Sequence, residues 1–366
     1  MTHSGRDRDR ACGRCLARSW LVERLGGHLD RAGPRVRAAL ALPDGELIAA
    51  LAGNRRDEVV EETRRLDLGQ LRARAAAADL GLICRHDATY PALLRPLATA
   101  PAVLYVAGDL DRALTLLEQD VVAIVGARRA SGYGLEVARS LGRGLVAAGI
   151  TVISGMALGI DSAAHAGALT AHGATVAVLP GGADRPYPAS RRALYSRIVA
   201  GGGVVSELPA GAAVRRWALP ARNRIIAALA AMTIVVEAGA RSGALVTAAC
   251  ARELGRPVGA VPGRVTSELA TGPNGLIRTG ATLIEGAQDV LDELFGEGVV
   301  KASETLRPPL REELERLLAA IGAGHDTLAT LTRHGFAAER ALAGVTELEL
   351  MGYVRRGPGG RFQAVP

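Results

Sequence analysis

The segment Val121-Val-Ala-Ile-Val-Gly-Ala-Arg-Arg-Ala-Ser-Gly-Tyr-Gly134 decides the fold class of this chain. Its apolar and mostly β-branched beginning is typical of a strand that is buried on both faces. Glycines and other small residues follow and lead directly into a predicted helix. A buried strand joined to a helix by a glycine-rich turn starts a β-α-β unit, so the segment predicts a parallel sheet covered by helices.

The same pattern recurs along the central chain, where short apolar runs alternate with Ala- and Leu-rich stretches. The runs start about 25–30 residues apart, which is the length of one strand and its crossover helix. We therefore predict an α/β fold with a mainly parallel sheet, and we expect ligands to bind beyond the carboxyl ends of its strands. The predicted strands start near Val121, Ile150, Ala174, Gly203, Met232, Pro257 and Thr282.

Smaller regions flank the sheet. Short helices are predicted from about residue 15 to residue 66, and the apolar run at 101–108 predicts an edge strand that leads into the main domain. Near the other end, three predicted helices and a basic, glycine-rich hairpin indicate a winged helix, a fold that serves both DNA binding and protein interaction. The predicted division is a small helical domain at 1–67, a core at 68–298, a linker at 299–309 and a winged helix at 310–366.

Composition narrows the classes of partner. A chain of 366 residues is long enough for two or three domains, and its net charge of +7 favours a polyanionic partner. Lys301 is the only lysine, so the basic side chains are almost all arginines. Aromatic residues make up only 3% of the chain, which argues against a base-stacking platform. Any binding to nucleic acid is therefore expected to depend on charge and on backbone contacts.

Residues 1–10 are polar and contain no apolar segment of the kind found in signal peptides, and no apolar run reaches membrane-spanning length. We therefore expect a cytoplasmic protein without a membrane partner. The four cysteines are too few and too scattered for a disulfide framework. Cys12 and Cys15 form a C-x-x-C pair. Only His3 and His28 lie near it in the sequence, so neither a metal site nor a cofactor is predicted.

The first two loops after predicted strands contain candidate phosphate-binding groups. Gly126 opens a turn whose backbone N–H groups and helix dipole suit an anion, and Arg128 and Ser131 of the same turn can add side-chain contacts. In the second loop, Ser154 and the Gly155 amide can contact a phosphate. A dinucleotide-binding protein would place an acidic residue here and would carry a G-x-G-x-x-G turn, so NAD binding is disfavoured.

The most distinctive stretch is Arg215-Arg-Trp-Ala-Leu-Pro-Ala-Arg-Asn-Arg224. We predict that Arg222 and Arg224 lie in the first turn of a helix, where positive charge is unfavourable unless an anion or a carboxylate compensates for it. Glu237, at the end of the next predicted strand, is a natural salt-bridge partner for one of them.

Further candidates lie on other helix starts. The loop after Glu237 supplies Arg241 together with Ser242 and Gly243, which begin another predicted helix. Asp161 is expected to cap a helix or to orient an arginine, because no second carboxylate or nucleophile is placed beside it for acid-base catalysis. Together the helix starts predict a basic groove along one edge of the sheet, suited to a flexible phosphate backbone.

In order and spacing, these motifs resemble the DNA-processing protein A (DprA/Smf) family over about residues 68–294. The resemblance includes the two flanking regions, of which the first corresponds to a SAM-like or helix-hairpin-helix-like accessory domain. The motifs are G-A-R-x-x-S-x-Y-G at 126–134, S-G-x-A-x-G-I-D at 154–161, Y-P at 187–188, S-E at 206–207, P-A-R-N-R-I-I at 220–226, E-A at 237–238, R-S-G-A-L-V-T-A at 241–248, V-P-G at 261–263 and G-x-N-x-L-I at 272–277.

The resemblance implies an extended Rossmann-like core that forms a homodimer and binds single-stranded DNA. It also implies that the protein protects incoming DNA and loads the RecA recombinase during natural transformation, without catalytic activity. The key arginine of the family's first glycine loop corresponds to Arg128. A basic residue before the P-x-R-N-R motif corresponds to Arg216 or to Arg215, and the sequence does not choose between them.

Two alternatives remain. Nucleotide-hydrolysing phosphoribohydrolases have similar cores and use a P-G-G-x-G-T-x-x-E loop. The segment Pro180-Gly-Gly-Ala-Asp184 begins in the same way but lacks the Thr and the Glu, so no general acid is left. The other alternative is a regulator that binds duplex DNA through its winged helix.

Overall fold

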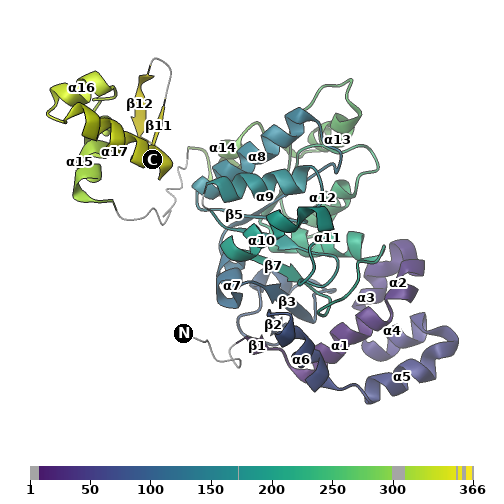
Figure 1. Ribbon diagram of the computed structural model, residues 1–366. Helices are drawn as coiled ribbons and strands as arrows, with labels where there is room; N and C mark the ends of the chain where they lie inside the picture. The colour runs from purple at the N-terminus through teal and green to yellow at the C-terminus, as the bar shows by residue number, and fades with distance from the viewer. Residues whose placement is uncertain (1–7, 172, 299–309, 352, 357–359, 365–366) are drawn as a thin grey trace. The chain divides into compact units, whose positions relative to one another are not determined.

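The computed structural model describes residues 8–171, 173–298, 310–351, 353–356 and 360–364. The chain divides into two compact units, Met1–Lys301 and Ala302–Pro366. The predicted linker at 299–309 lies outside the described residues. The predicted α/β architecture, with a mainly parallel sheet and a winged helix, is confirmed (Figure 1).

A ten-stranded sheet runs through the first unit in the order β1-β2-β3-β7-β6-β5-β4-β8-β9-β10. The strands from β4 to β10 pair in parallel, and each starts within one residue of its predicted position. The bounds are β1 Asp9–Arg10, β2 Leu80–Cys84, β3 Val103–Ala107, β4 Val121–Val125, β5 Thr151–Ser154, β6 Thr175–Val178, β7 Gly203–Ser206, β8 Met232–Val235, β9 Val258–Ala260 and β10 Thr282–Leu283.

One strand prediction is wrong. The run at 101–108 contains β3, which is not an edge strand, because it pairs in antiparallel fashion with β2 on one side and with β7 on the other. All its side chains are buried, which explains its continuously apolar sequence. Beyond β2, the short strand β1 extends the sheet and was not predicted.

Helices cover both faces of the sheet. In β4, Val121, Ala123 and Val125 pack with helices α7, α11 and α12, whereas Val122 and Ile124 pack with α8, α9 and α14. This alternation follows from the two-residue period of a strand. The covering helices are α7 Leu110–Glu118, α8 Gly132–Ala147, α9 Ile160–Thr170, α10 Arg192–Gly201, α11 Ala218–Leu229, α12 Gly243–Glu253, α13 Thr271–Arg278 and α14 Ala287–Phe295.

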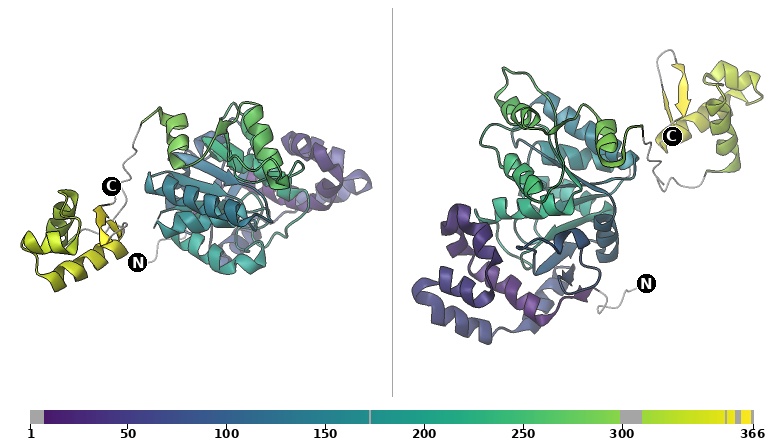
Figure 2. Two further views of the ribbon diagram at one scale, coloured as in Figure 1. Left: turned by 90° about the horizontal axis from the view of Figure 1, so that it is seen from above. Right: turned by 180° about the vertical axis from the view of Figure 1, so that it is seen from behind.

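The helical segment predicted as a separate domain belongs to the same compact unit as the core. Its helices gather at one end of the sheet in all views (Figures 1 and 2). Trp217 of the core is only 3% exposed because it packs among Leu21, Leu25 and Leu29 of this segment, and its backbone N–H donates to the Asp30 carboxylate at 2.9 Å. The helices are α1 Gly13–Arg24, α2 Gly26–Ala32, α3 Val36–Ala41, α4 Asp44–Leu51, α5 Arg56–Arg64 and α6 Leu68–Ala77.

The second unit has the helices and hairpin of a winged helix around an apolar core of its own, which includes Leu314, Leu331, Val345 and Phe362. The three helices lie within two residues of the bounds that the sequence predicts for them, 310–323, 326–332 and 337–351, and a hairpin follows as expected. The elements are α15 Glu312–Gly322, α16 Leu328–Arg333, α17 Ala338–Leu350, β11 Val354–Arg356 and β12 Phe362–Ala364. Among the described residues of both units, none of the helices combines the length and the apolar character needed to span a membrane.

Candidate functional site

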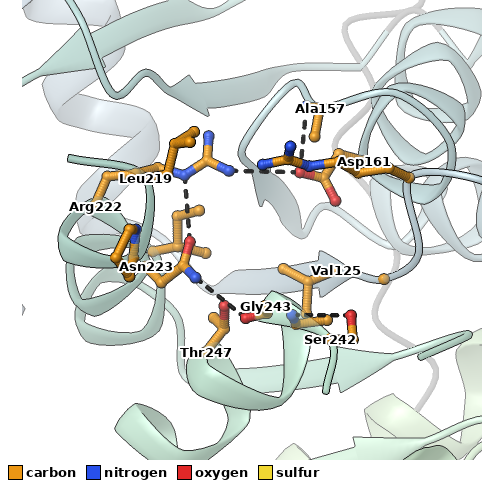
Figure 3. A pocket seen from close by; sticks show the side chains of 14 residues that line it. Val125, Ala157, Asp161, Leu219, Arg222, Asn223, Ser242, Gly243 and Thr247 are labelled. Carbon is orange, nitrogen blue, oxygen red and sulfur yellow. Dashed lines mark hydrogen bonds and ion pairs between the residues drawn. The ribbon is translucent and has the colours of Figure 1, made fainter. Parts of the chain in front are cut away.

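The candidate site lies where the order of the sheet reverses. From β4 the chain continues through β5, β6 and β7 on one side, and then returns to add β8, β9 and β10 on the other side of β4. Such a reversal separates the loops at the carboxyl ends of the two central strands and leaves a crevice for a ligand. A cavity of about 360 Å³ opens here, which we call the switch-point cavity (Figure 3). Its lining consists of Val125, Gly126, Arg128, Ala157, Asp161, Leu219, Pro220, Arg222, Asn223, Ile226, Ser242, Gly243, Ala244 and Thr247.

A buried ion pair forms one wall of the cavity. Arg222 is 7% exposed, and its guanidinium lies 3.9 Å from the carboxylate of Asp161 (Figure 3). The same guanidinium donates to the carbonyls of Gly155 and, at 2.7 Å, Val178. Burial lowers the pKa of Arg222 and raises that of Asp161, because each charge is removed from water. An anion in the cavity would offset the first of these penalties.

Asp161 lies in the first turn of α9 and accepts the N–H of Ala157 at 3.3 Å. Because its carboxylate lies beside the guanidinium of Arg222, Asp161 can orient this arginine, as the sequence predicts. Among the residues that line the switch-point cavity, Asp161 is the only carboxylate, and none is a histidine or a cysteine. The lining therefore offers electrostatic binding of an anion but no pair of groups for acid-base chemistry.

The prediction that Arg222 and Arg224 lie in the first turn of a helix is wrong. Helix α11 begins at Ala218, four residues before Arg222. Pro220 falls in the first turn, where a missing N–H has no cost, so the helix starts earlier than the sequence suggested. Because two residues advance a helix by about 200°, the two arginines point to opposite sides.

Arg224 faces away from the cavity and is only 1% exposed. It pairs with both carboxylate oxygens of Glu207, at 2.6 and 2.9 Å, and donates to the carbonyl of Thr99 at 2.9 Å. A bidentate pair of this kind leaves the guanidinium no free donor for DNA. The position of Arg224 therefore fits a structural role.

In contrast to the prediction, none of the described arginines forms an ion pair with Glu237. Its carboxylate accepts the backbone N–H of Ser131 at 2.9 Å and the Ser131 hydroxyl at 2.6 Å. Ser131 caps α8 by accepting the N–H of Gly134 at 3.1 Å, and a side chain at Gly134 would collide with the same carboxylate. Glu237 thus fixes the first glycine loop from the neighbouring strand β8, and the Ser131 hydroxyl donates to it rather than facing the cavity.

Ser154 and Gly155 also lie away from the lining. The Ser154 hydroxyl is buried and donates to the carbonyl of Ile124 at 2.6 Å. A Cβ atom at Gly155 would overlap the guanidinium of Arg222. These two residues hold β5 and Arg222 in place. Gly126 does line the cavity, and a Cβ atom there would come within 2.6 Å of Ile160.

Three predicted arginines are exposed without a hydrogen bond or ion pair to any residue in the described part of the chain. They are Arg128, Arg216 and Arg241, which we call the open arginines. Arg128 lines the cavity, Arg241 precedes the lining residue Ser242, and Arg216 lies three residues before Leu219. Arg215 differs from its neighbour, because its guanidinium lies 3.7 Å from Asp30 of the helical segment.

The start of α12 completes the lining. Ser242 caps this helix by accepting the N–H of Ala244 at 3.3 Å, and Gly243 is the first helical residue. Asn223, which the sequence analysis did not select, donates to the Gly243 carbonyl at 3.2 Å and ties α11 to α12. Thr247 lines the cavity and was also missed. Both residues lie inside quoted motifs, so their place between selected residues was the available signal.

Comparison with known proteins agrees with the motifs. Residues 81–295, more than half of the chain, match the sequence profile of DNA recombination-mediator protein A. Residues 301–360 match the DprA winged helix domain. A DprA-type DNA processing protein of Mycobacterium tuberculosis is 46% identical over 198 residues, which cover 54% of this chain and 50% of that relative. The chain thus spans about half the length of this relative.

Two solved structures are similar in sequence and in fold. DNA processing protein A from Streptococcus pneumoniae has a TM-score of 0.63 and 33% identity, over 76% of this chain and 96% of that one. The protein from Helicobacter pylori, described for its single-stranded DNA binding mode, has a TM-score of 0.53 and 28% identity, over 59% and 97%. The predicted family is confirmed. Because the profile match covers more than half of its residues, the chain belongs to the DNA recombination-mediator protein A (DprA/Smf) family.

Proposed function

We propose that this protein binds single-stranded DNA over the switch-point cavity and acts as a recombination mediator. The observation that carries the proposal is the set of open arginines, Arg128, Arg216 and Arg241, which are exposed without carboxylate partners among the described residues. Such arginines attract phosphates, because binding releases counterions from the DNA. The related protein from Helicobacter pylori is described as binding single-stranded DNA, which supports the same ligand here.

The depth of the site favours a single strand over a duplex. The cavity of about 360 Å³ is lined by Arg222, whose side chain is almost fully buried, so a phosphate must enter a recess to approach it. A flexible single strand can bend one nucleotide into such a recess. A duplex holds its phosphates on a stiff helix and is bent only at a cost of several kcal/mol, on the order of 1–6.

The lining supports binding rather than catalysis. A phosphoribohydrolase would need a general acid or base at the cavity, where Asp161 is the only carboxylate among the lining residues. Asp184, in the loop that begins like the hydrolase motif, accepts the N–H of Gly211 at 2.9 and 3.1 Å. We therefore propose a protein without enzymatic activity. Release of a free base from nucleoside monophosphates, measured by chromatography, would contradict this part of the proposal.

The proposal extends to the partners implied by the family resemblance. We propose that the protein acts in the cytoplasm as a homodimer that protects incoming single-stranded DNA and loads RecA onto it during natural transformation. A mediator should raise the rate at which RecA covers an oligonucleotide already bound by single-strand-binding protein. Light scattering after size-exclusion chromatography gives the oligomeric state. A monomer, or RecA loading no faster than without the protein, would remove the corresponding part of the proposal.

The first test is fluorescence anisotropy with a labelled oligonucleotide, single-stranded and duplex, across a series of salt concentrations. We expect tighter binding to the single strand and an observed association constant that falls steeply with salt, because phosphate contacts release counterions. Equal binding to both forms, or affinity that does not depend on salt, would reject the proposed interface. Nucleotide turnover would then be measured next.

A further inference from the structure

A second cluster of reactive side chains lies far from the switch-point cavity in the sequence, where α1 begins beside the end of β2. Cys12 immediately precedes α1 and Cys15 lies in its first turn, while Cys84 ends β2 and His86 follows in a turn. Their potential ligand atoms, three sulfurs and one ring nitrogen, all lie within 4.8 Å of one another. Because Cys84 and His86 are distant from the C-x-x-C pair along the chain, they were not predicted as its partners.

The distances suit a shared cation better than hydrogen bonds alone. Nδ1 of His86 lies 3.3 Å from Sγ of Cys12 and 3.4 Å from Sγ of Cys15. A ring nitrogen has either one hydrogen or one lone pair, so it can make only one of these two contacts as a good hydrogen bond. In a tetrahedral zinc site, bonds of about 2.3 Å to sulfur and about 2.0–2.1 Å to nitrogen set the sulfur–nitrogen separation at about 3.5 Å.

We propose that Cys12, Cys15, Cys84 and His86 bind one Zn²⁺ ion in a structural site. Three thiolates and one imidazole form a tetrahedral donor set that zinc prefers, and four protein ligands leave no open position for a substrate. On binding, the thiols release their protons to water, and no oxidant or reductant is needed. The site is independent of the proposed DNA interface.

The local structure leaves the sulfurs available. Cys12 is the residue that caps α1, yet its side chain makes no capping hydrogen bond. Its backbone N–H lies 3.4 Å from Sγ of Cys84, in the place of the outer hydrogen bonds that orient metal ligands. The N–H of Asp87 donates to the Cys84 carbonyl at 2.9 Å, which closes the turn that brings His86 back over the cluster.

Exposure gives an ion a path into the site. Cys15 and Cys84 are buried, whereas Cys12 and His86 are exposed on the outer side. Cys12 and Cys15 precede the residues that match the family profile, and Cys84 lies within them. The ion would join the first helix of the N-terminal segment to the sheet, and closing a long loop in this way removes conformational freedom from the unfolded chain.

The test uses the full chain, purified in a reducing buffer without added zinc. Metal analysis by inductively coupled plasma mass spectrometry should find about one zinc per chain. The variants Cys84→Ser and His86→Ala should each contain less than about one tenth as much zinc. Loss of a residue that only orients a ligand already weakens metal binding about tenfold or more, and each of these variants removes a ligand itself. Cys250→Ser is the matched control, because Cys250 is a free, buried cysteine that is not part of the cluster. His86→Cys should restore zinc binding through a fourth thiolate.

A readout that does not depend on any variant is substitution with Co²⁺ after removal of zinc by a chelator. The intact chain should then show the intense visible absorption of tetrahedral Co²⁺ with thiolate ligands, and added Zn²⁺ should abolish it. The proposal is overturned if the intact chain binds neither Zn²⁺ nor Co²⁺. It is also overturned if Cys84→Ser and His86→Ala retain as much zinc as Cys250→Ser, or if mass spectrometry of the protein as purified finds no zinc and a Cys12–Cys15 disulfide instead.

Discussion

Arginines are prominent both around the switch-point cavity and in the winged helix, but their surroundings differ. The open arginines, Arg128, Arg216 and Arg241, have no carboxylate partner in the described part of the chain. In the winged helix, three arginines are each paired with a carboxylate, whereas Arg316, Arg333 and Arg340 are exposed and have no carboxylate partner among the described residues. The pairs are Arg311–Glu347 at 2.6 Å, Arg356–Glu349 at 3.0 Å and Arg361–Asp326 at 2.9 Å.

The two units also differ in net charge. Residues 302–366 contain eight basic and eight acidic residues, so the net charge of +7 belongs entirely to residues 1–301. An exposed arginine that is paired with a carboxylate presents less unbalanced positive charge to a phosphate than an unpaired arginine does. The comparison teaches that the first unit is favoured as the DNA site by its net positive charge and by the cavity beside the open arginines, rather than by arginine content or by the absence of ion pairs alone.

The largest expected effect comes from removing an arginine whose partner is buried. Arg224→Ala should lower the free energy of unfolding by about 3–5 kcal/mol, because Glu207 would remain buried and unpaired. Urea denaturation of the two proteins measures the difference. Arg37→Ala is the control, since its partner Glu253 is exposed and the loss should stay below about 1 kcal/mol. Equal losses in the two variants would show that Arg224 is not structural.

The next effect concerns DNA directly. Arg128→Ala should weaken single-strand binding about tenfold, which is the size of one lost charge-assisted hydrogen bond, and should do so for all sequences alike. The slope of log association constant against log salt should fall by about one. Arg361→Ala, which removes a paired arginine of the winged helix, is the matched control and should leave both values unchanged. An unchanged affinity for Arg128→Ala would reject its role.

A smaller effect separates two adjacent arginines. Arg216→Ala should weaken binding roughly threefold and lower the salt slope, because its guanidinium is exposed, has no partner among the residues that the structure describes, and can contact a phosphate. Arg215→Ala should leave affinity nearly unchanged, since Arg215 faces Asp30 at 3.7 Å. Anisotropy titrations of both variants in the same salt series measure the difference. The assignment would have to be reversed if Arg215→Ala had the stronger effect.

The smallest effect is expected from truncation. A chain that ends at residue 301 retains the whole first unit and should bind single-stranded DNA within about twofold of the full chain, a difference of about 0.4 kcal/mol. Circular dichroism confirms folding, and anisotropy measures the affinity. Loss of binding in a folded truncated chain would move the DNA site to the winged helix and would reverse the comparison.

The sequence predicted best those features that depend on local patterns. The starts of β4 to β10 were predicted within one residue, because short β-branched runs between helical stretches are a local signal. The start of α11 was predicted too late, because the helix begins at Ala218 and includes Pro220, which is tolerated in a first turn. Nor does the local sequence show that Arg224 pairs with Glu207, seventeen residues earlier, and is buried there.

Features that depend on distant partners were not predictable in the same way. Nothing local to Glu237 shows that it accepts hydrogen bonds from Ser131 rather than from an arginine. The choice between Arg215 and Arg216 depends on Asp30, in a helix far away along the chain. The cluster of Cys12 with Cys84 likewise arises only when the N-terminal segment reaches the sheet.

Helix α11 carries Arg222 and Arg224 on opposite sides, and each is held by groups outside the helix. The helix therefore has a single rotational setting, because a roll about its axis would break both sets of contacts at once. A one-residue insertion before Arg222 would turn the following residues by about 100° and would remove both arginines from their partners. The wall of the cavity is thus preformed, and a ligand would meet a surface that does not have to reorganise.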